Sequence, residues 1–594
     1  MKIDRSTPGP VLSPNALYIL KKRYLKRDIR GRVSETPSEM FRRVASVVAG
    51  AELGYGSPAD AKARENAFFG VMSRLEFLPN SPTLLNAGRL SGQMSSCFVL
   101  PVGDSAASLE TSIEEAKTVH RSGGGTGFNF SRIRPREKES GGFEAAGPTS
   151  FLAPLSQATA AVKQGGIRMG CNIATLDVRH PDILSYIHTK NSLSALPNFY
   201  LSVGVTSEFM EAVKKDKNYS LTDPATGKTV RTLRAKGVFD KIVEQTWKTG
   251  DPGLIFLDRI QEGNPVPVLG EIEGVSGCGE QLLFGYESCN LGSVNLARML
   301  DGHRPCRIDY VKLAETVRLA VRFLDDVIDV NRYPLPQIAD ATLRTRKIGL
   351  GVMGFADMLA RLGVPYGSSR AVALAEKLMG FINDEAHLAS EALGAEKGVF
   401  PAFKGSTYEV AGRPMRNASC TTVAPTGTIS LIAGCSNGIE PFFALIYMRR
   451  IRGGNNLLEV NREFIRATEK CGFYSVQLVE RLAAGARLSE IPGIPDGAKR
   501  LFATASEIKA TWHIGIQAAF QRHVDNAVSK TVNLPNESTP GEIADIYLEA
   551  YELGLKGITI YRDGSRRKQP LEGRIKAGMV AGYLKKAAAN GEIL

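Results

Sequence analysis

The sequence predicts an α/β protein in which a helical N-terminal region precedes one large α/β domain. Between residues 78 and 565, short apolar runs alternate with helical stretches, as in a sheet covered by helices. Residues 14–77 instead carry apolar residues at helical spacing among charges. We therefore predict a helical region over 1–77, a catalytic α/β domain over 78–565 and a C-terminal tail over 566–594.

Individual elements follow from the same periodicity. Residues 16–20 and 40–45 supply the apolar stretches of the helical region. A long helix is predicted over 309–331, because apolar side chains recur on one face and Pro334 lies just beyond its end. The tail is rich in Lys, Ala and Gly, which predicts a poorly anchored segment.

The composition is that of a globular enzyme, with 43% hydrophobic and 23% charged residues. There is no apolar run of the roughly 18 residues that a membrane span needs, and the N-terminus lacks the apolar core of a signal peptide. We expect a cytoplasmic protein with no membrane contact. The net charge of +13 is dispersed over single residues and short clusters, which favours a solvated surface over a nucleic-acid groove.

The eight cysteines contain no Cys-x-x-Cys pair, and the seven histidines contain no His-Glu-x-x-His. We therefore expect no metal site built by the protein. In a cytosolic protein these thiols should be reduced, unless a catalytic cycle oxidises some of them.

The most informative segment is 276–296. In an extended chain alternate side chains face the same way, so Ser276, Cys278 and Glu280 are predicted to face one reacting centre. A second thiol, Cys289, follows eleven residues after Cys278. The carboxylate can take a proton, one thiol can carry a hydrogen atom or a radical, and another can supply electrons. The alternative for any single Cys is a small buried apolar residue.

Glycine-rich segments offer further candidates. Residues 349–354 match G-x-G-x-x-G, but the charged stretch before them argues against a buried strand, and we interpret them as a helix-packing cluster rather than a dinucleotide site. Residues 424–430 place hydroxyls and N–H groups where a helix begins, which suits phosphate binding or simple capping. Residues 121–130 are a ligand loop or a turn. Residues 80–88 with 95–97 add polar groups and a third thiol, Cys97, whose distance from Cys289 the spacing leaves open.

Taken together, these segments resemble ribonucleotide reductase, specifically its adenosylcobalamin-dependent class II. The resemblance covers about residues 14–568 and rests on many motifs that occur in the family's order. They are Asn80–Gly88, Ser96–Cys97, Gly123–Gly127, His180–Leu184, Cys278–Glu280, Tyr286–Ser293, Gly349–Gly354, Pro425–Ser430 and Gly557–Ser565.

The resemblance implies a ten-stranded α/β barrel with a catalytic finger loop that carries Cys278. By carry-over, Cys278 becomes the thiyl radical that takes the 3′ hydrogen of a ribonucleotide, and Glu280 accepts the 3′-hydroxyl proton. Cys97 and Cys289 reduce the 2′ position and end as a disulfide. A barrel interior would shield the radical from solvent.

The resemblance also implies binding roles. The substrate's sugar and phosphates would be held by Ser81, Thr83, Ser96, Gly125, Pro425, Thr426, Gly427, Thr428 and Ile429. The deoxynucleotide or ATP effectors that select the base would act at Asp104 and Ser105 and through the loop that contains Gly166 and Arg168.

The radical source points to adenosylcobalamin. The iron-dependent class uses two adjacent tyrosines near the C-terminus, where this chain has only Tyr561 after Ile560, and no glycyl-radical motif is present. We expect the chain to reduce ribonucleotides to 2′-deoxyribonucleotides, with di- or triphosphates left open as the substrate.

Two departures from the family limit this expectation. The family has Asn-Pro before the radical cysteine, where this chain has Ser276 and Gly277; serine is shorter than asparagine, and the loss of proline loosens the loop. No cysteine follows Cys471, so the reductant is expected to be a thioredoxin-like protein or a separate tail polypeptide. The alternative function is a catalytically impaired nucleotide-binding paralogue that regulates or assembles with an active reductase. A homodimer is expected.

Overall fold

The computed structural model describes residues 9–136, 146–164, 168–191, 196–303, 306–451, 456–565, 571–572 and 575. Within these ranges, residues 163, 164, 168, 169, 571 and 572 are described by their backbone alone. Nearly all of the predicted tail lies outside the described residues.

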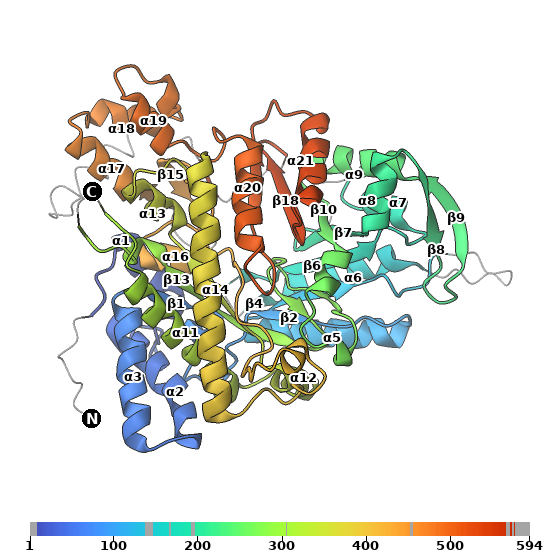
Figure 1. Cartoon of the computed structure of the whole chain (residues 1–594), viewed down its shortest axis with the longest axis horizontal. Coiled ribbons are helices and arrows are strands. Elements are labelled where there is room, and N and C mark those ends of the chain that lie inside the picture. The colour runs from blue at the N-terminus through green and yellow to red at the C-terminus, as the bar shows by residue number, and fades with distance from the viewer. Residues whose placement is uncertain are drawn as a thin grey trace.

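The predicted N-terminal helices are confirmed. They are α1 (Pro14–Ile19), α2 (Pro37–Ala49) and α3 (Pro58–Ser73), and each begins with proline at its first turn. Thr36 with Glu39, and Ser57 with Asp60, form reciprocal capping boxes that satisfy the free N–H groups of α2 and α3. Figure 1 shows α2 and α3 in blue, beside α11 and the long helix α14.

The central sheet consists of two parallel halves that run in opposite directions. The first half has the order β2-β3-β6-β7-β10, and the second contains β13, β14, β17 and β18. Strand β13 pairs antiparallel with β2, and β10 pairs antiparallel with β18. Their bounds are Cys97–Val99 (β2), Gly125–Asn129 (β3), Asn172–Asp177 (β6), Phe199–Val205 (β7), Gly253–Phe256 (β10), Ser288–Asn295 (β13), Ile348–Met353 (β14), Thr531–Leu534 (β17) and Gly557–Arg562 (β18).

A short extended segment closes the sheet into a ring. Thr421 forms a parallel bridge with Leu350 of β14, and Val423 forms one with Val528, just before β17. With this segment as the tenth strand, the ring is the predicted ten-stranded α/β barrel. Strand β1 (Phe77–Pro79) pairs with the C-terminal half of β13 and joins the helical region to the barrel.

The barrel holds a hairpin, β11 (Gly274–Val275) and β12 (Leu282–Leu283), which is the predicted finger loop. A Cβ on Gly127 of β3 would lie 1.9 Å from the Val275 carbonyl oxygen, so only glycine permits this close approach. On the opposite side, the carbonyl of Glu280 accepts hydrogen bonds from the Ala527 N–H (3.0 Å) and the Thr422 hydroxyl (2.7 Å). The finger is therefore attached to both halves of the barrel.

The prediction for residues 349–354 was wrong in one respect. They lie in the buried strand β14, not in a helix-packing cluster, and the charges before them are neutralised in the interior. Lys347 pairs with Glu287 at 2.9 Å, and Arg346 pairs with Asp325 at 2.8 Å. The glycines allow close packing, since a Cβ on Gly351 would lie 2.6 Å from the Thr422 carbonyl oxygen.

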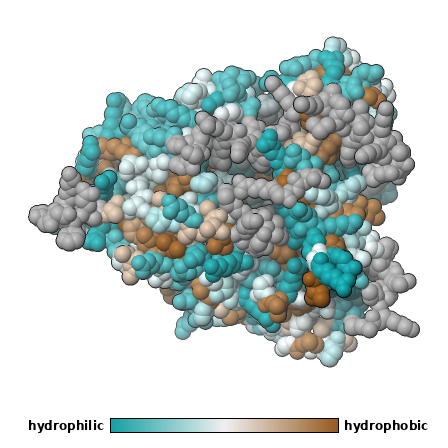
Figure 2. Space-filling model, turned by 180° about the vertical axis from the view of Figure 1, so that it is seen from behind, coloured by the Kyte–Doolittle hydropathy of each residue, from teal (hydrophilic) through white to brown (hydrophobic). Residues whose placement is uncertain are grey.

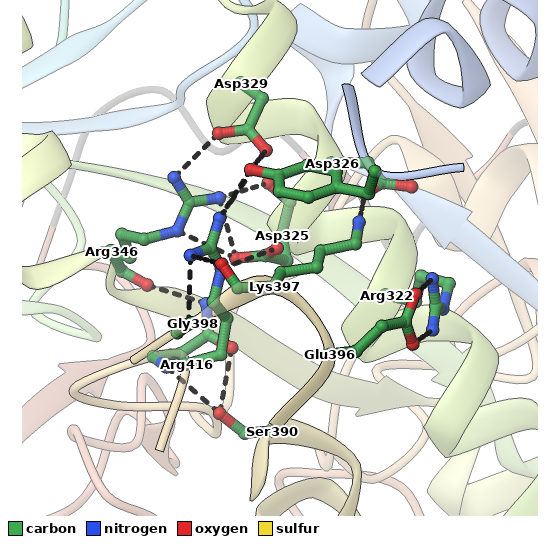
Figure 3. A network of polar contacts seen from close by, with 12 residues as sticks. Arg322, Asp325, Asp326, Asp329, Arg346, Ser390, Glu396, Lys397, Gly398 and Arg416 are labelled. Atoms are coloured by element: carbon green, nitrogen blue, oxygen red, sulfur yellow. Dashed lines mark hydrogen bonds and ion pairs between the residues drawn. The ribbon is translucent and has the colours of Figure 1, made fainter. Parts of the chain in front are cut away.

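The long helix predicted over 309–331 is α11 (Tyr310–Val330), and its predicted face, which includes Leu313, Val321 and Ile328, is buried. It packs beside α14 (Ser369–Lys397). A buried ion network joins these helices to the N-terminal region (Figure 3). Lys397 at the end of α14 donates to Glu52 at 2.9 Å and to Asp326 of α11 at 2.5 Å.

Burial works against ionisation of Glu52, but hydrogen bonds from Asp326, Lys397 and Arg322 outweigh it and lower its pKa to about 2. Burial raises the pKa of Asp326 well above its usual range, against the charge of Lys397, which lowers it. Figure 3 also shows Arg346 and Arg416 around Asp325 and Asp329. The network fixes the helical region against the barrel wall.

On the face shown in Figure 2, hydrophobic residues lie in small groups among hydrophilic ones. In the part of the chain that the structure describes, we find no helix both long and apolar enough to span a membrane.

Candidate active site

Two cysteines face each other across neighbouring strands. Cys97 of β2 lies directly opposite Cys289 of β13, and the Ser96 N–H donates to the Cys289 carbonyl at 3.1 Å. Opposed residues of an antiparallel pair have Cβ atoms about 4.5–5.5 Å apart, and the corresponding Cα spacing is within the range that a disulfide bridges. Both thiols are free and buried. The pair can therefore give up two electrons and close a disulfide with little backbone movement.

The finger loop brings a third sulfur and a carboxyl to this pair. Glu280 accepts a hydrogen bond from the Cys97 thiol at 3.2 Å and another from the Ser276 hydroxyl at 3.1 Å. The Ser276 hydroxyl in turn accepts from the Gln281 N–H at 3.3 Å. Cys278 lies at the tip, with its side chain exposed. The short serine thus reaches the carboxyl directly.

The buried environment raises the pKa of each of these groups. Burial is the main cause that raises the pKa of Glu280, against the hydrogen bonds from Cys97 and Ser276. Burial also raises the pKa of Cys97 and of Cys289, and the charges of Glu280 and Glu287 add to the effect. These sulfurs therefore carry hydrogen, as donors of protons or hydrogen atoms must.

Cys97, Cys278 and Glu280 line one cavity of about 250 Å³, whereas Cys289 and Ser276 are fully buried and do not line it. Of the predicted substrate residues, nearly all lie on its wall: Ser81, Ser96, Gly125, Pro425, Thr426, Gly427, Thr428 and Ile429, together with Cys97, Cys278 and Glu280. Thr83 is the exception. It is fully buried, and its hydroxyl donates to the Asn80 side chain and the Met94 carbonyl, so it shapes the segment behind the wall.

The predicted phosphate loop is a tight turn. Thr426 has a φ of 54°, and its hydroxyl accepts from the Gly438 N–H at 2.7 Å, which holds the turn against the next loop. The short helix α16 (Ile429–Ala433) follows at once. Gly427 and Thr428, which follow the segment at 421–423 that closes the barrel, therefore line the cavity.

The predicted effector residues lie away from this cavity. Ser105 caps α5 (Ala106–Ser122) by accepting from the Ser108 N–H, and Asp104 pairs with Arg134 at 2.5 Å. Gly166 lies outside the described residues, and Arg168 is described only by its backbone, in β5 (Arg168–Met169). Helix α5 is capped by Ser105 at one end and by Gly123, on the cavity wall, at the other. It therefore links the predicted effector residues to the cavity.

The chain matches two models of one protein family. The model of the ribonucleotide reductase barrel domain matches residues 95–561, and that of the ribonucleotide reductase all-alpha domain matches residues 11–92. This chain belongs to the ribonucleotide reductase family. Its structure is similar to the class Id ribonucleotide reductase alpha subunit of Actinobacillus ureae, with a TM-score of 0.76 and 23% identity over 93% of this chain and 97% of that one.

Curated members of the reductase family are similar along nearly the whole chain. The vitamin B12-dependent ribonucleoside-diphosphate reductase of Thermoplasma acidophilum is 45% identical, and the alignment covers 94% of this chain and 80% of that protein. The enzyme of the same name from Mycobacterium tuberculosis is 48% identical, with the same coverage.

Three cavity residues were missed from the sequence. Tyr24 comes from the helical region, and its hydroxyl shares a 2.8 Å hydrogen bond with Ser81. Arg23 lies beside it and brings a positive charge to the cavity wall. Cys171, just before β6, lies against the finger tip. No local motif marks these residues, because they reach the cavity only through the tertiary fold.

Cys278 also borders a second, smaller cavity of about 50 Å³ on the other side of the finger. Gly279, Gly557 and Thr559 lie on its wall, so it extends between the finger and β18. Cys278 therefore borders two cavities, one that it shares with Cys97 and one that lies beside β10 and β18.

One group of potential metal ligands occurs elsewhere among the described residues: His387, Cys420 and Asp525. Asp525 already accepts from the Cys420 and Thr421 N–H groups and from His387 at 2.9 Å. Burial lowers the pKa of His387, but the charge of Asp525 outweighs this effect and raises it. The two residues form an ion pair that supports the segment at 421–423, which closes the barrel.

Proposed function

We propose that this chain is an adenosylcobalamin-dependent ribonucleoside-diphosphate reductase. The observation that carries the proposal is that Cys278, Glu280 and Cys97 line one cavity, with Cys289 directly opposite Cys97 on the neighbouring strand. The names of the relatives from T. acidophilum and M. tuberculosis supply the cofactor and the diphosphate substrate.

In the proposed reaction a ribose lies between the finger tip and the cysteine pair. Cys278, as a thiyl radical, removes the 3′ hydrogen atom, and Glu280 takes the 3′-hydroxyl proton. The 2′ hydroxyl leaves as water with a proton from Cys97, whose thiol donates to Glu280. Cys97 and Cys289 provide two electrons and become a disulfide, and the hydrogen of Cys289 goes to C2′. Glu280 returns its proton to the 3′ oxygen, and Cys278 returns a hydrogen atom to C3′. The sum is ribonucleotide plus two thiols giving deoxyribonucleotide, water and one disulfide.

Binding is proposed for the residues that share the cavity. The turn at 425–429 offers backbone N–H groups to the phosphates, and Arg23 offers a positive charge. Tyr24 with Ser81 and Ser96 offers hydroxyls to the sugar. Because Ser276 contacts Glu280 directly, the departure from the family's asparagine gives no reason to infer an impaired paralogue.

Adenosylcobalamin, when bound, supplies the one-electron chemistry that removes a hydrogen atom from a thiol. Cys278 borders a second cavity, beside Gly279, Gly557 and Thr559. At about 50 Å³ this cavity is too small for an adenosyl group, and aliphatic and lysine side chains line most of its wall. An adenosyl group would therefore reach Cys278 from this side only if the cavity widened.

Regulation and assembly are proposed on the family resemblance. We propose that deoxynucleotides or ATP bind near Asp104 and Ser105, with Gly166 and Arg168 in the loop that relays their identity. A homodimer and a thioredoxin-like reductant or separate tail polypeptide complete the proposal.

The test is turnover. Purified protein with adenosylcobalamin, dithiothreitol and each ribonucleoside di- and triphosphate, with and without effectors, should form deoxynucleotides, fastest from diphosphates. Cys278→Ser should abolish turnover while nucleotide binding remains, and Cys471→Ser, at an exposed thiol outside the cavity, serves as the control. Folded protein that forms no deoxynucleotide under any of these conditions would contradict the proposal.

A further inference from the structure

Cys171 lies beside the radical cysteine but has no role in the reaction as described above. It lines the same cavity as Cys278, and its thiol donates to the Gly277 carbonyl at 3.5 Å. A Cβ built on Gly277 would lie 3.7 Å from the Cys171 sulfur and 3.3 Å from the Cys171 carbonyl oxygen. The finger tip therefore rests on Cys171 by both backbone and side chain.

The backbone that presents this thiol is held on both sides. The Cys171 carbonyl accepts from the Thr126 N–H of β3 at 3.1 Å, and the Asn172 N–H donates to the Asn198 carbonyl at 2.9 Å. The buried Asn172 side chain also donates to the Thr159 hydroxyl at 3.0 Å and contacts His120. Cys171 is thus fixed to two barrel strands, which suits a group that positions another.

The finger tip needs such support. Cys278 has glycine on either side, and Gly279 has a φ of 80°, so the tip itself has little conformational restraint. We propose that Cys171 is a positioning residue for Cys278: it fixes the finger tip through Gly277 and accepts a hydrogen bond from the Cys278 thiol, which keeps the reacting hydrogen on that sulfur.

If the chain is the proposed reductase, on which this inference rests, the hydrogen bond between Cys278 and Cys171 has a chemical role. Cys278 must be a thiol before its hydrogen atom is first removed and again when it returns hydrogen to C3′, because a thiolate has no hydrogen atom to give. Cys278 is solvent-accessible at the finger tip, yet the pKa of its thiol is raised: the hydrogen bond with Cys171 is the first cause, followed by desolvation inside the barrel and the charge of Glu280. Cys171 itself donates to Gly277, so its sulfur lone pairs are available as acceptors.

The test measures Cys278 without cofactor or substrate, so its outcome is independent of turnover. Reduced enzyme is alkylated with iodoacetamide under anaerobic conditions over a range of pH, and the modification of Cys278 is followed by peptide mass spectrometry. The thiolate is the reactive form. In Cys171→Ala the pH profile should move to lower pH, with Cys278 modified several-fold faster at pH 8. Cys171→Ser retains a hydroxyl that donates and accepts, and should lie close to the parent.

Cys471→Ala, at an exposed thiol outside the cavity, should leave the profile unchanged and provides the control. With turnover established, Cys171→Ala should lower kcat and leave KM for the ribonucleotide near its parent value. A Cys278 profile identical in the parent and a folded Cys171→Ala variant would overturn the proposal. So would a shifted profile in a variant that turns over as fast as the parent.

Discussion

Gly127 sets the position of the finger loop, so replacing it with alanine tests the geometry of the whole site. The added Cβ would lie 1.9 Å from the Val275 carbonyl oxygen, and such contacts are essentially never below 3.0 Å, so the hairpin or the strand must move by about 1.1 Å. The obstacle is backbone and cannot turn aside. A displacement of about 1 Å at reacting atoms can lower a rate by about 100-fold.

We therefore expect Gly127→Ala to lower kcat for ribonucleotide reduction by about 100-fold, while KM changes little, because Ser81 and residues 425–429 stay in place. Gly237→Ala is the matched control: this glycine lies in the helix α9 (Ala235–Thr249), with nothing within 4 Å of the added Cβ. The assay is deoxynucleotide formation at saturating substrate, with circular dichroism to confirm folding. A folded Gly127→Ala enzyme with kcat within about threefold of the parent would refute the view that the finger is fixed by this contact.

Three further predictions concern the site and its support. Ser276→Ala removes a hydrogen bond to Glu280 and should lower kcat about 10-fold. In both the parent and the variant, the rate should fall as the pH drops through the raised pKa of Glu280. An unchanged kcat would mean that Ser276 is dispensable. Without added reductant the parent should form at most one deoxynucleotide per site, and Cys289→Ser should form none, which a single-turnover product count decides. Glu52→Gln removes a carboxylate that pairs with both Lys397 and Arg322, leaving Lys397 with Asp326 alone, and should cost about 3 kcal/mol of unfolding free energy near neutral pH, measured by urea denaturation. Because folding lowers the pKa of Glu52 from 4.5 to about 2, this difference should persist above pH 4.5 and disappear as the pH falls towards 2, and a difference independent of pH would argue against the ion pair.

The sequence supports the fold class and part of the site for physical reasons. The long helix α11 is recognisable because a single apolar face repeats with helical period. Alternation along an extended chain is enough to associate Cys278 with Glu280. The pairing of Cys97 with Cys289 is different, since it depends on strand register between segments far apart in the chain, and only the family resemblance suggested it.

Other features escaped local reasoning because their partners are distant. Strand β14 was misjudged from the charges that precede it, and those charges become acceptable only when Glu287 and Asp325 meet them in the interior. Tyr24 and Cys171 carry no motif and reach the cavity from elements that the chain order separates from it. A pattern in one segment cannot report such contacts.

The closure of the barrel has a consequence for how the enzyme responds to its ligands. The ring is completed at 421–423, where one short segment is hydrogen-bonded on both sides: the Thr422 N–H donates to the Leu350 carbonyl, and the Ser529 N–H donates to the Val423 carbonyl. The same segment runs directly into the turn at 425–429, on the cavity wall. A nucleotide bound to that turn would contact the segment that closes the barrel, so nucleotide binding should stabilise the closed barrel against unfolding.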